Sequence, residues 1–215
     1  MGRVNKKRVN VANLEKLLDA FGKKISVRVG IIGEKAYQKH PGTDLTNAEL
    51  GAVHEFGATI NHPGGIPYLI KEDGTAQFVS KEKGKGLPKT KPHQINIPAR
   101  SFLREPILGA KGKKEIKKEV AARIKKLGWQ LSKDMELNKI AYQNDKNLDE
   151  LLKTVADFVG MAAFDRVIEA FDNNLIEPPT LPASKRKRKY NPDAPTLMDT
   201  GQLRNSISYE IKEIQ

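Results

Sequence analysis

The sequence predicts an α+β fold in which an antiparallel sheet is packed by two or three long helices. Apolar residues recur at helical spacing over residues 148–171 and again over residues 113–135, so both segments predict long helices. Residues 24–32 and 206–211 alternate apolar and polar side chains, which is the period of a half-buried strand. Together these segments predict a mixture of helices and strands.

Residues 148–171 are the segment around which the rest of the chain is predicted to pack. Asn147 and Glu150 provide a cap at its start, and the Asp-Asn-Asn sequence at 172–174 favours a turn at its end. Residues 158–164 contain no polar side chain, so this helix must be covered on several sides. Its small-residue centre, residues 160–163, predicts the close approach of another backbone, as when a helix lies across a sheet. The predicted core residues are Phe56, Phe102, Leu103, Leu152, Val155, Val159, Ala162, Leu203 and Ile207.

Shorter elements are indicated by local signals. Thr46 and Glu49 have the spacing of a capping box, so a helix is predicted to begin there and to end at Gly57. The other expected elements are a helix over 9–21, a turn-rich passage over 58–65, a strand at 95–97, and helical turns over 102–108 and 197–205.

Two extended segments interrupt this single predicted domain of residues 1–215. Residues 66–71 and 75–80 flank a Glu-Asp-Gly turn and predict a β-hairpin, which we assign to an inserted hairpin arm spanning 66–94. Residues 177–196 are rich in proline and predict an extended basic loop without a folded element. We expect both segments to be disordered in the free protein and to become ordered on docking.

The net charge of +12 is concentrated in two places. Residues 111–126 hold eight basic and two acidic residues, and residues 185–189 read KRKRK. Such local charge predicts surfaces that meet an acidic partner, either nucleic acid or protein. In 111–126 the lysines lie opposite an apolar stripe, so a solvated helix face is the simpler interpretation. For KRKRK, contact with a partner and exposure to solvent are equally open interpretations. Tyr190 is the single neighbouring aromatic residue, which does not indicate sequence-specific recognition of bases.

No pattern in the sequence predicts an enzyme. The chain has no cysteine and none of the glycine-rich phosphate loops or nucleophile motifs. His54-Glu55 resembles half of a zinc-binding HExxH motif, but Ala58 stands where the second histidine belongs. We therefore predict no catalytic residue, no metal and no cofactor. The longest apolar run is also far below the roughly 20 residues that a membrane span requires, so no membrane partner is expected.

Three motifs occur in a fixed order: ELGAVHEFG at 49–57, IPARSFLR at 97–104, and LMDTGQLRNSISY at 197–209 after the basic loop. Together they resemble the tailed-bacteriophage tail-completion and head-to-tail joining proteins, also called virion morphogenesis or neck proteins. The resemblance extends from about residue 27 to the end of the chain. Ser101 departs from it, because relatives commonly have proline there, and the hairpin arm is longer than usual.

The resemblance implies a non-enzymatic virion protein that forms a ring, with a hexamer favoured, in the neck or at the head-proximal end of the tail after assembly in the host cytoplasm. The implied partners are other copies of the chain, neighbouring connector and tail proteins, and packaged DNA through non-specific contact. For Arg100 and Arg104, local capping of their own loop is the competing interpretation. The alternative function is a basic nucleic-acid-binding accessory protein. The candidate assembly contacts are Arg100, Arg104, Lys185, Arg186, Lys187, Arg188, Lys189, Tyr68 and Phe78.

Overall fold

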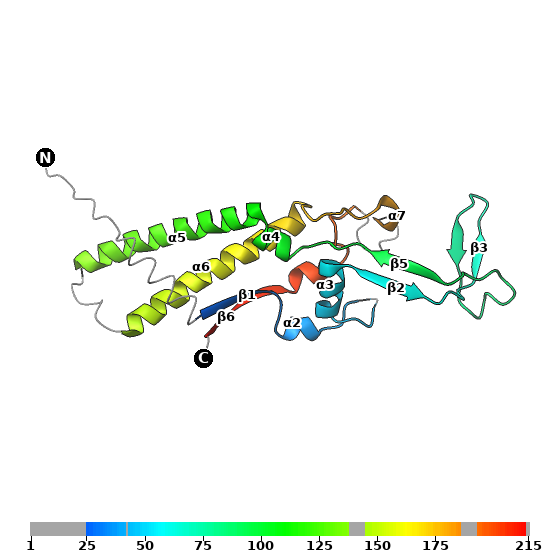
Figure 1. Cartoon of the computed structure of the whole chain (residues 1–215), viewed down its shortest axis with the longest axis horizontal. Coiled ribbons are helices and arrows are strands. Elements are labelled where there is room, and N and C mark those ends of the chain that lie inside the picture. Colours follow the sequence, from blue (N-terminus) through cyan, green and yellow to red (C-terminus); the bar gives the residue numbers. More distant parts are fainter. Residues whose placement is uncertain (1–24, 42, 138–144, 186–192, 214–215) are drawn as a thin grey trace.

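The computed structural model describes residues 25–41, 43–137, 145–185 and 193–213. These residues form a mixture of helices and antiparallel strands, so the predicted α+β class is confirmed. In Figure 1 the body is elongated, with two long helices toward one end and a strand-built arm projecting at the other. The predicted helix over 9–21 and four of the candidate contacts, Arg186 to Lys189, lie outside the described residues.

The helix α6 (Asp145–Asp172) packs across two strands, β1 (Ile25–Ile31) and β6 (Ile207–Glu213). The two strands pair antiparallel, with Ile31 opposite Ile207. A Cβ added to Gly160 would lie 2.3 Å from Cδ2 of Tyr209, so the Tyr209 ring rests directly on the glycine. The sequence predicts a backbone close to residues 160–163, but the neighbour of Gly160 is the side chain of Tyr209 from β6.

A second long helix, α5 (Ala110–Leu137), runs beside α6, and the short α4 (Arg104–Leu108) packs on both (Figure 1). Arg123 of α5 joins the two long helices, because its Nη2 lies 2.6 Å from Glu119 and 3.6 Å from Asp165 of α6. The two predicted long helices are present, and each begins three residues before its predicted start.

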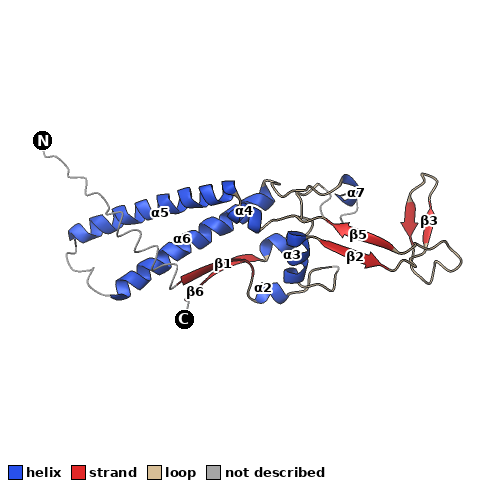
Figure 2. Cartoon of the chain, viewed as in Figure 1, coloured by secondary structure: helices blue, strands red, loops and turns tan. Residues whose placement is uncertain are grey.

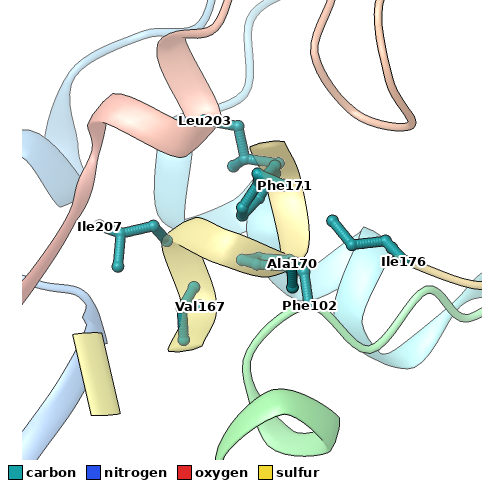
Figure 3. Close-up of a cluster of buried hydrophobic side chains, with 7 residues drawn as sticks. All are labelled: Phe102, Val167, Ala170, Phe171, Ile176, Leu203 and Ile207. Atoms are coloured by element: carbon teal, nitrogen blue, oxygen red, sulfur yellow. The ribbon is translucent and has the colours of Figure 1, made fainter. Parts of the chain in front are cut away.

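The main core lies where the end of α6 meets the second and third sequence motifs (Figure 3). The Phe102 and Phe171 rings pack with their centres 5.4 Å apart. A smaller cluster of Ile25, Leu152 and Ala156 lies further along α6. Of the predicted core residues, Leu103 and Val159 are half-buried, and the following are buried: Phe102, Leu152, Val155, Ala162, Leu203 and Ile207.

The prediction that Phe56 belongs to the core is wrong, since its side chain is 71% exposed. Phe56 ends α3 (Asn47–Phe56), whose predicted capping box is present: Thr46 N–H donates to Glu49 Oε2 at 2.8 Å, and Glu49 N–H donates to Thr46 Oγ1 at 3.2 Å. The buried residues of α3 are Asn47, Gly51 and Glu55, spaced four apart on one face. Because this inward face is polar, Phe56, one position past Glu55, is turned about 100° away from the body.

The arm is longer than the sequence predicts. β2 (Ala58–His62) pairs antiparallel with β5 (His93–Ile97), and this ribbon carries the hairpin of β3 (Tyr68–Ile70) and β4 (Ala76–Phe78) (Figure 2). The predicted hairpin is confirmed, but the turn-rich passage expected from residue 58 is wrong for 58–62, where pairing with β5 makes a strand. We use "the arm" for residues 58–97 from here on.

The remaining elements are single helical turns. α8 (Gln202–Asn205) confirms the helical turn predicted in the third motif, whereas α2 (Glu34–Tyr37) lies in a segment with no predicted element. α7 (Pro182–Lys185) is a turn of helix inside the predicted extended loop, so the prediction of no folded element is wrong there. The described strands form three separate two-stranded sheets, and only the β1–β6 sheet is covered by the long helices.

Candidate functional site

The first and second sequence motifs meet around the carboxylate of Glu55, which is only 4% exposed. Its Oε1 accepts hydrogen bonds from the Ser101 hydroxyl at 2.6 Å and from the Arg104 N–H at 3.1 Å, while its Oε2 accepts from the Leu103 N–H at 2.9 Å. The carboxylate of the first motif therefore caps α4, whose first N–H groups have no partner inside the helix. Ser101 also accepts from the Glu105 N–H at 3.0 Å, which confirms its predicted capping role.

A second polar cluster joins the first motif to the third through Asn47, which is fully buried. Its Oδ1 accepts hydrogen bonds from Gln202 Nε2 at 2.9 Å and from His40 Nδ1 at 3.1 Å, and its Nδ2 donates to the Lys35 carbonyl at 2.9 Å. These bonds satisfy the buried amide and fix α8 against the start of α3.

A pocket of about 310 Å³ lies between these two clusters. We call it the motif pocket, because each motif contributes to its wall: Leu50 and His54 from the first, Arg100 from the second, and Leu197, Asp199 and Leu203 from the third. The basic loop adds Thr180 and Ser184. Leu197 has a positive φ of 63°, a backbone conformation that is uncommon for a leucine and concentrates at functional sites.

His54 is a neutral imidazole in this pocket at physiological pH. Burial lowers its pKa to about 4, with smaller contributions from Arg100 and His40. Its Nδ1 atom is buried and has no hydrogen-bond partner among the described residues, which is an uncommon state for a buried polar atom.

Arg100 is held at the pocket by its backbone and by one side-chain nitrogen. Its N–H donates to the His54 carbonyl at 2.6 Å, and its Nε donates to the Pro178 carbonyl at 2.8 Å. Desolvation lowers the pKa of its guanidinium. The local role predicted for Arg100 is therefore present at Nε. Arg104, by contrast, is exposed at the start of α4, and its backbone N–H rather than its side chain makes the cap bond.

The motif pocket also contains a serine, a histidine and an aspartate, namely Ser184, His54 and Asp199. In a catalytic triad the carboxylate binds the second ring nitrogen of the histidine and orients it. His54 Nδ1 has no such partner, and a pKa near 4 makes His54 a weak base at neutral pH. The described residues therefore lack the carboxylate–histidine hydrogen bond of a nucleophilic triad.

The arm presents a second candidate surface. On one face of the β2–β5 ribbon, Ile60 lies opposite Ile95 and the His62 ring stacks on His93 with centres 4.9 Å apart. Ile60 and Ile95 are 46% and 39% exposed. The other face is polar, with Thr59 bonded to Asn96 and Gln94 bonded to Asn61. Sequence reasoning missed this amphipathic ribbon because β2 itself was missed.

Two predicted contacts lie further out on the arm. Tyr68 and Phe78 are cross-strand partners in the hairpin, and they are half-buried and 58% exposed respectively. Ile70, next to the turn, is 68% exposed. Exposed apolar side chains on a projecting hairpin are typical of a surface that becomes covered in an assembly.

The basic face predicted on α5 is exposed. Arg123 turns toward α6, and the exposed basic residues are Lys111, Lys113, Lys114, Lys117, Lys118, Lys125 and Lys126. Lys118 is 3.7 Å from Glu115 on the same helix. Lys185 is the last residue of α7.

Across the described ranges, no group of three or more histidine, aspartate or glutamate side chains is placed to hold a metal ion. In that same part of the chain, no helix combines the length and apolar character that crossing a bilayer would require. No protein-family model, curated protein or solved structure matches this chain. The resemblance to phage neck proteins therefore remains a prediction from the three motifs.

Proposed function

We propose that this chain is a structural virion protein of a tailed bacteriophage, which forms a ring in the neck or at the head-proximal end of the tail. One observation carries the proposal: the three motifs that resemble the neck proteins, 40 or more residues apart in sequence, are joined by two buried polar clusters and line one pocket. Glu55 of the first motif holds Ser101 and Leu103 of the second, while Asn47, just ahead of the first, holds Gln202 of the third. Motifs that determine a shared fold are expected to meet in this way.

The shape of the molecule supports an assembly role. A ring subunit needs a rigid body and a segment that reaches its neighbour. Here α5 and α6 supply the body, and the arm projects from it (Figure 1) with exposed apolar residues such as Ile70 and Phe78. A free monomer would leave these side chains in water, whereas a neighbouring subunit would cover them.

The experiment that tests this proposal uses the phage that encodes the chain, with a stop codon early in its gene. Negative-stain microscopy of the resulting particles is expected to show heads beside separate, otherwise complete tails. Abnormally long tails would support the same proposal and make the protein the terminating ring of the tail. Supplying the protein from a plasmid should restore infectious particles. Intact infectious particles without the protein would refute the proposal.

The exposed lysine face of α5 favours one second candidate, a nucleic-acid-binding accessory protein. Seven exposed lysines over residues 111–126 would attract the phosphate backbone without sequence preference. This candidate predicts DNA binding that weakens steeply with salt, and a shallower salt dependence when Lys113, Lys117 and Lys125 are changed to Gln. Unchanged binding in that triple variant, or no binding by the wild-type protein at low salt, would exclude it.

A further inference from the structure

The motif pocket contains one buried polar atom without a hydrogen-bond partner and one guanidinium without a carboxylate partner among the described residues. Arg100 uses Nε for the Pro178 carbonyl, and its guanidinium has no carboxylate partner in the part of the chain that the structure describes. His54 Nδ1 is buried without a hydrogen bond. A partly desolvated cation without a counter-ion is unfavourable, and so is an unpaired buried ring nitrogen. Both groups line the same pocket, so one incoming acceptor would satisfy the guanidinium and lie beside the imidazole.

The walls of the pocket match the side chain of an acidic amino acid. Leu50, Leu197 and Leu203 provide apolar sides, against which a methylene stem can pack, and Arg100 provides a cationic end. Nucleic acid fits less well. A phosphate backbone is recognised by several cations along an open track, whereas the described lining of this pocket supplies one guanidinium.

We propose that the motif pocket receives a glutamate side chain from the arm of a second copy of this chain, and that this residue is Glu72. The proposal rests on the ring assembly proposed above and gives that ring its contact: the arm of one subunit docks on the body of the next. Such a head-to-tail contact uses two different surfaces and closes into a ring when the rotation between subunits permits.

Glu72 is chosen because it is the free carboxylate at the outer hairpin turn of the arm. Its neighbour Asp73 is already engaged, since its Oδ1 accepts from the Thr75 N–H at 2.9 Å and from the Thr75 hydroxyl at 2.6 Å. Glu72 is exposed and has no partner among the described residues. The other exposed arm glutamate, Glu82, stands between two lysines, which offset its charge.

The pocket is tested independently of subunit assembly, by titrating acetate into protein whose histidines are labelled with carbon-13 and following the histidine signals by NMR. The His54 signal, assigned with a His54→Gln variant, is expected to shift in a saturable way with sodium acetate and not with sodium chloride at the same ionic strength. Arg100→Met is expected to abolish the shift, and Arg104→Met, an exposed arginine four residues later in the chain, is the matched control that should keep it. A linear response in the wild type, or an unchanged response in Arg100→Met, would overturn the pocket as a carboxylate site.

The occupant is tested by exchanging the two charges. Light scattering after size exclusion is expected to show an assembly for the wild type and for Glu82→Arg, the matched arm control. Glu72→Arg and Arg100→Glu are each expected to remain at the 24.0 kDa mass of the single chain, and the double variant to regain the assembly. Circular dichroism checks that each variant is folded, and Arg100→Met replaces Arg100→Glu if the latter unfolds.

An assembly of normal size in Glu72→Arg, or a double variant that stays a single chain, would overturn Glu72 as the occupant. If the wild-type protein never assembles, both the ring and the role of Glu72 as occupant are refuted. The acetate titration still decides whether the pocket binds a carboxylate. The two failures are therefore separable.

Discussion

Replacing Glu55 with glutamine should lower the free energy of unfolding far more than the same replacement of an exposed glutamate. The carboxylate accepts three hydrogen bonds from Ser101, Leu103 and Arg104. The amide nitrogen of glutamine cannot accept a hydrogen bond. At least one of the two backbone N–H groups therefore loses its acceptor and instead faces the N–H donor of the glutamine amide. Hydrogen bonds to charged groups contribute about 1.5–3 kcal/mol, and an unsatisfied buried donor costs about 1–3 kcal/mol. Since the two effects overlap, we expect Glu55→Gln to lower the free energy of unfolding by about 2–4 kcal/mol.

The measurement is urea unfolding followed by far-ultraviolet circular dichroism, with the midpoint and slope compared between variants. Glu105→Gln is the control, because Glu105 is exposed on α4 and surface changes of this kind stay within about 0.5 kcal/mol. If Glu55→Gln were as stable as Glu105→Gln, the assignment of Glu55 as the cap that joins the motifs would be wrong.

Four further outcomes are expected. Gly160→Ala gains about 1 kcal/mol of helix propensity but places a Cβ 2.3 Å from the Tyr209 ring. Because overpacking of this kind costs about 1–3 kcal/mol, the variant should be net destabilised in the same urea assay. Hydrogen bonding from Arg204 lowers the pKa of Asp172 below its ordinary 3.8, so the cost of Asp172→Asn should be present at neutral pH and disappear as the pH falls through the folded-state pKa. The pKa of His54 is about 4 in the folded state and 6.5 ordinarily, so between these values the unfolded state binds the proton more readily. The stability of the wild type should therefore fall as the pH drops from 6.5 to 4, and His54→Gln should show a smaller fall. Equal slopes of stability against pH would contradict this. Hydrogen exchange of the free protein should be much faster in the arm and the basic loop than in α6, and equal protection would contradict their predicted disorder.

The long helices were predictable because their signal extends over many turns. Residues 113–135 and 148–171 repeat the helical period often enough for single exceptions not to matter, and the observed bounds, Ala110–Leu137 and Asp145–Asp172, differ by one to three residues. β2 was not predictable in this way, because its five residues are held by pairing with β5 more than 30 residues later. A strand that depends on a distant partner carries little local signal.

The candidate site was only partly predictable for a related reason. Arg100 was identified from its motif, but the burial of Asn47, Gly51 and Glu55 runs against the rule that apolar residues mark the inward face of a helix. The rule therefore predicts Phe56 in the core, whereas the structure buries Glu55. The usable signal was the spacing of four between Asn47, Gly51 and Glu55, which puts an amide, a glycine and a carboxylate on one helical face.

The pairing of β1 with β6 has a consequence for how the chain acquires its structure. Ser26 and Lys212, which are hydrogen-bonded across this sheet, are 186 residues apart in the sequence. Leu203 and Ile207, which complete the main core over Val167 and Phe171, also come near the end of the chain. During synthesis α6 therefore leaves the ribosome before the segment that covers its apolar face exists. Contacts of such high sequence separation form slowly. The growing chain therefore exposes the apolar face of α6 until the third motif emerges. The motif that completes the pocket is thus also the one that ends this aggregation-prone interval.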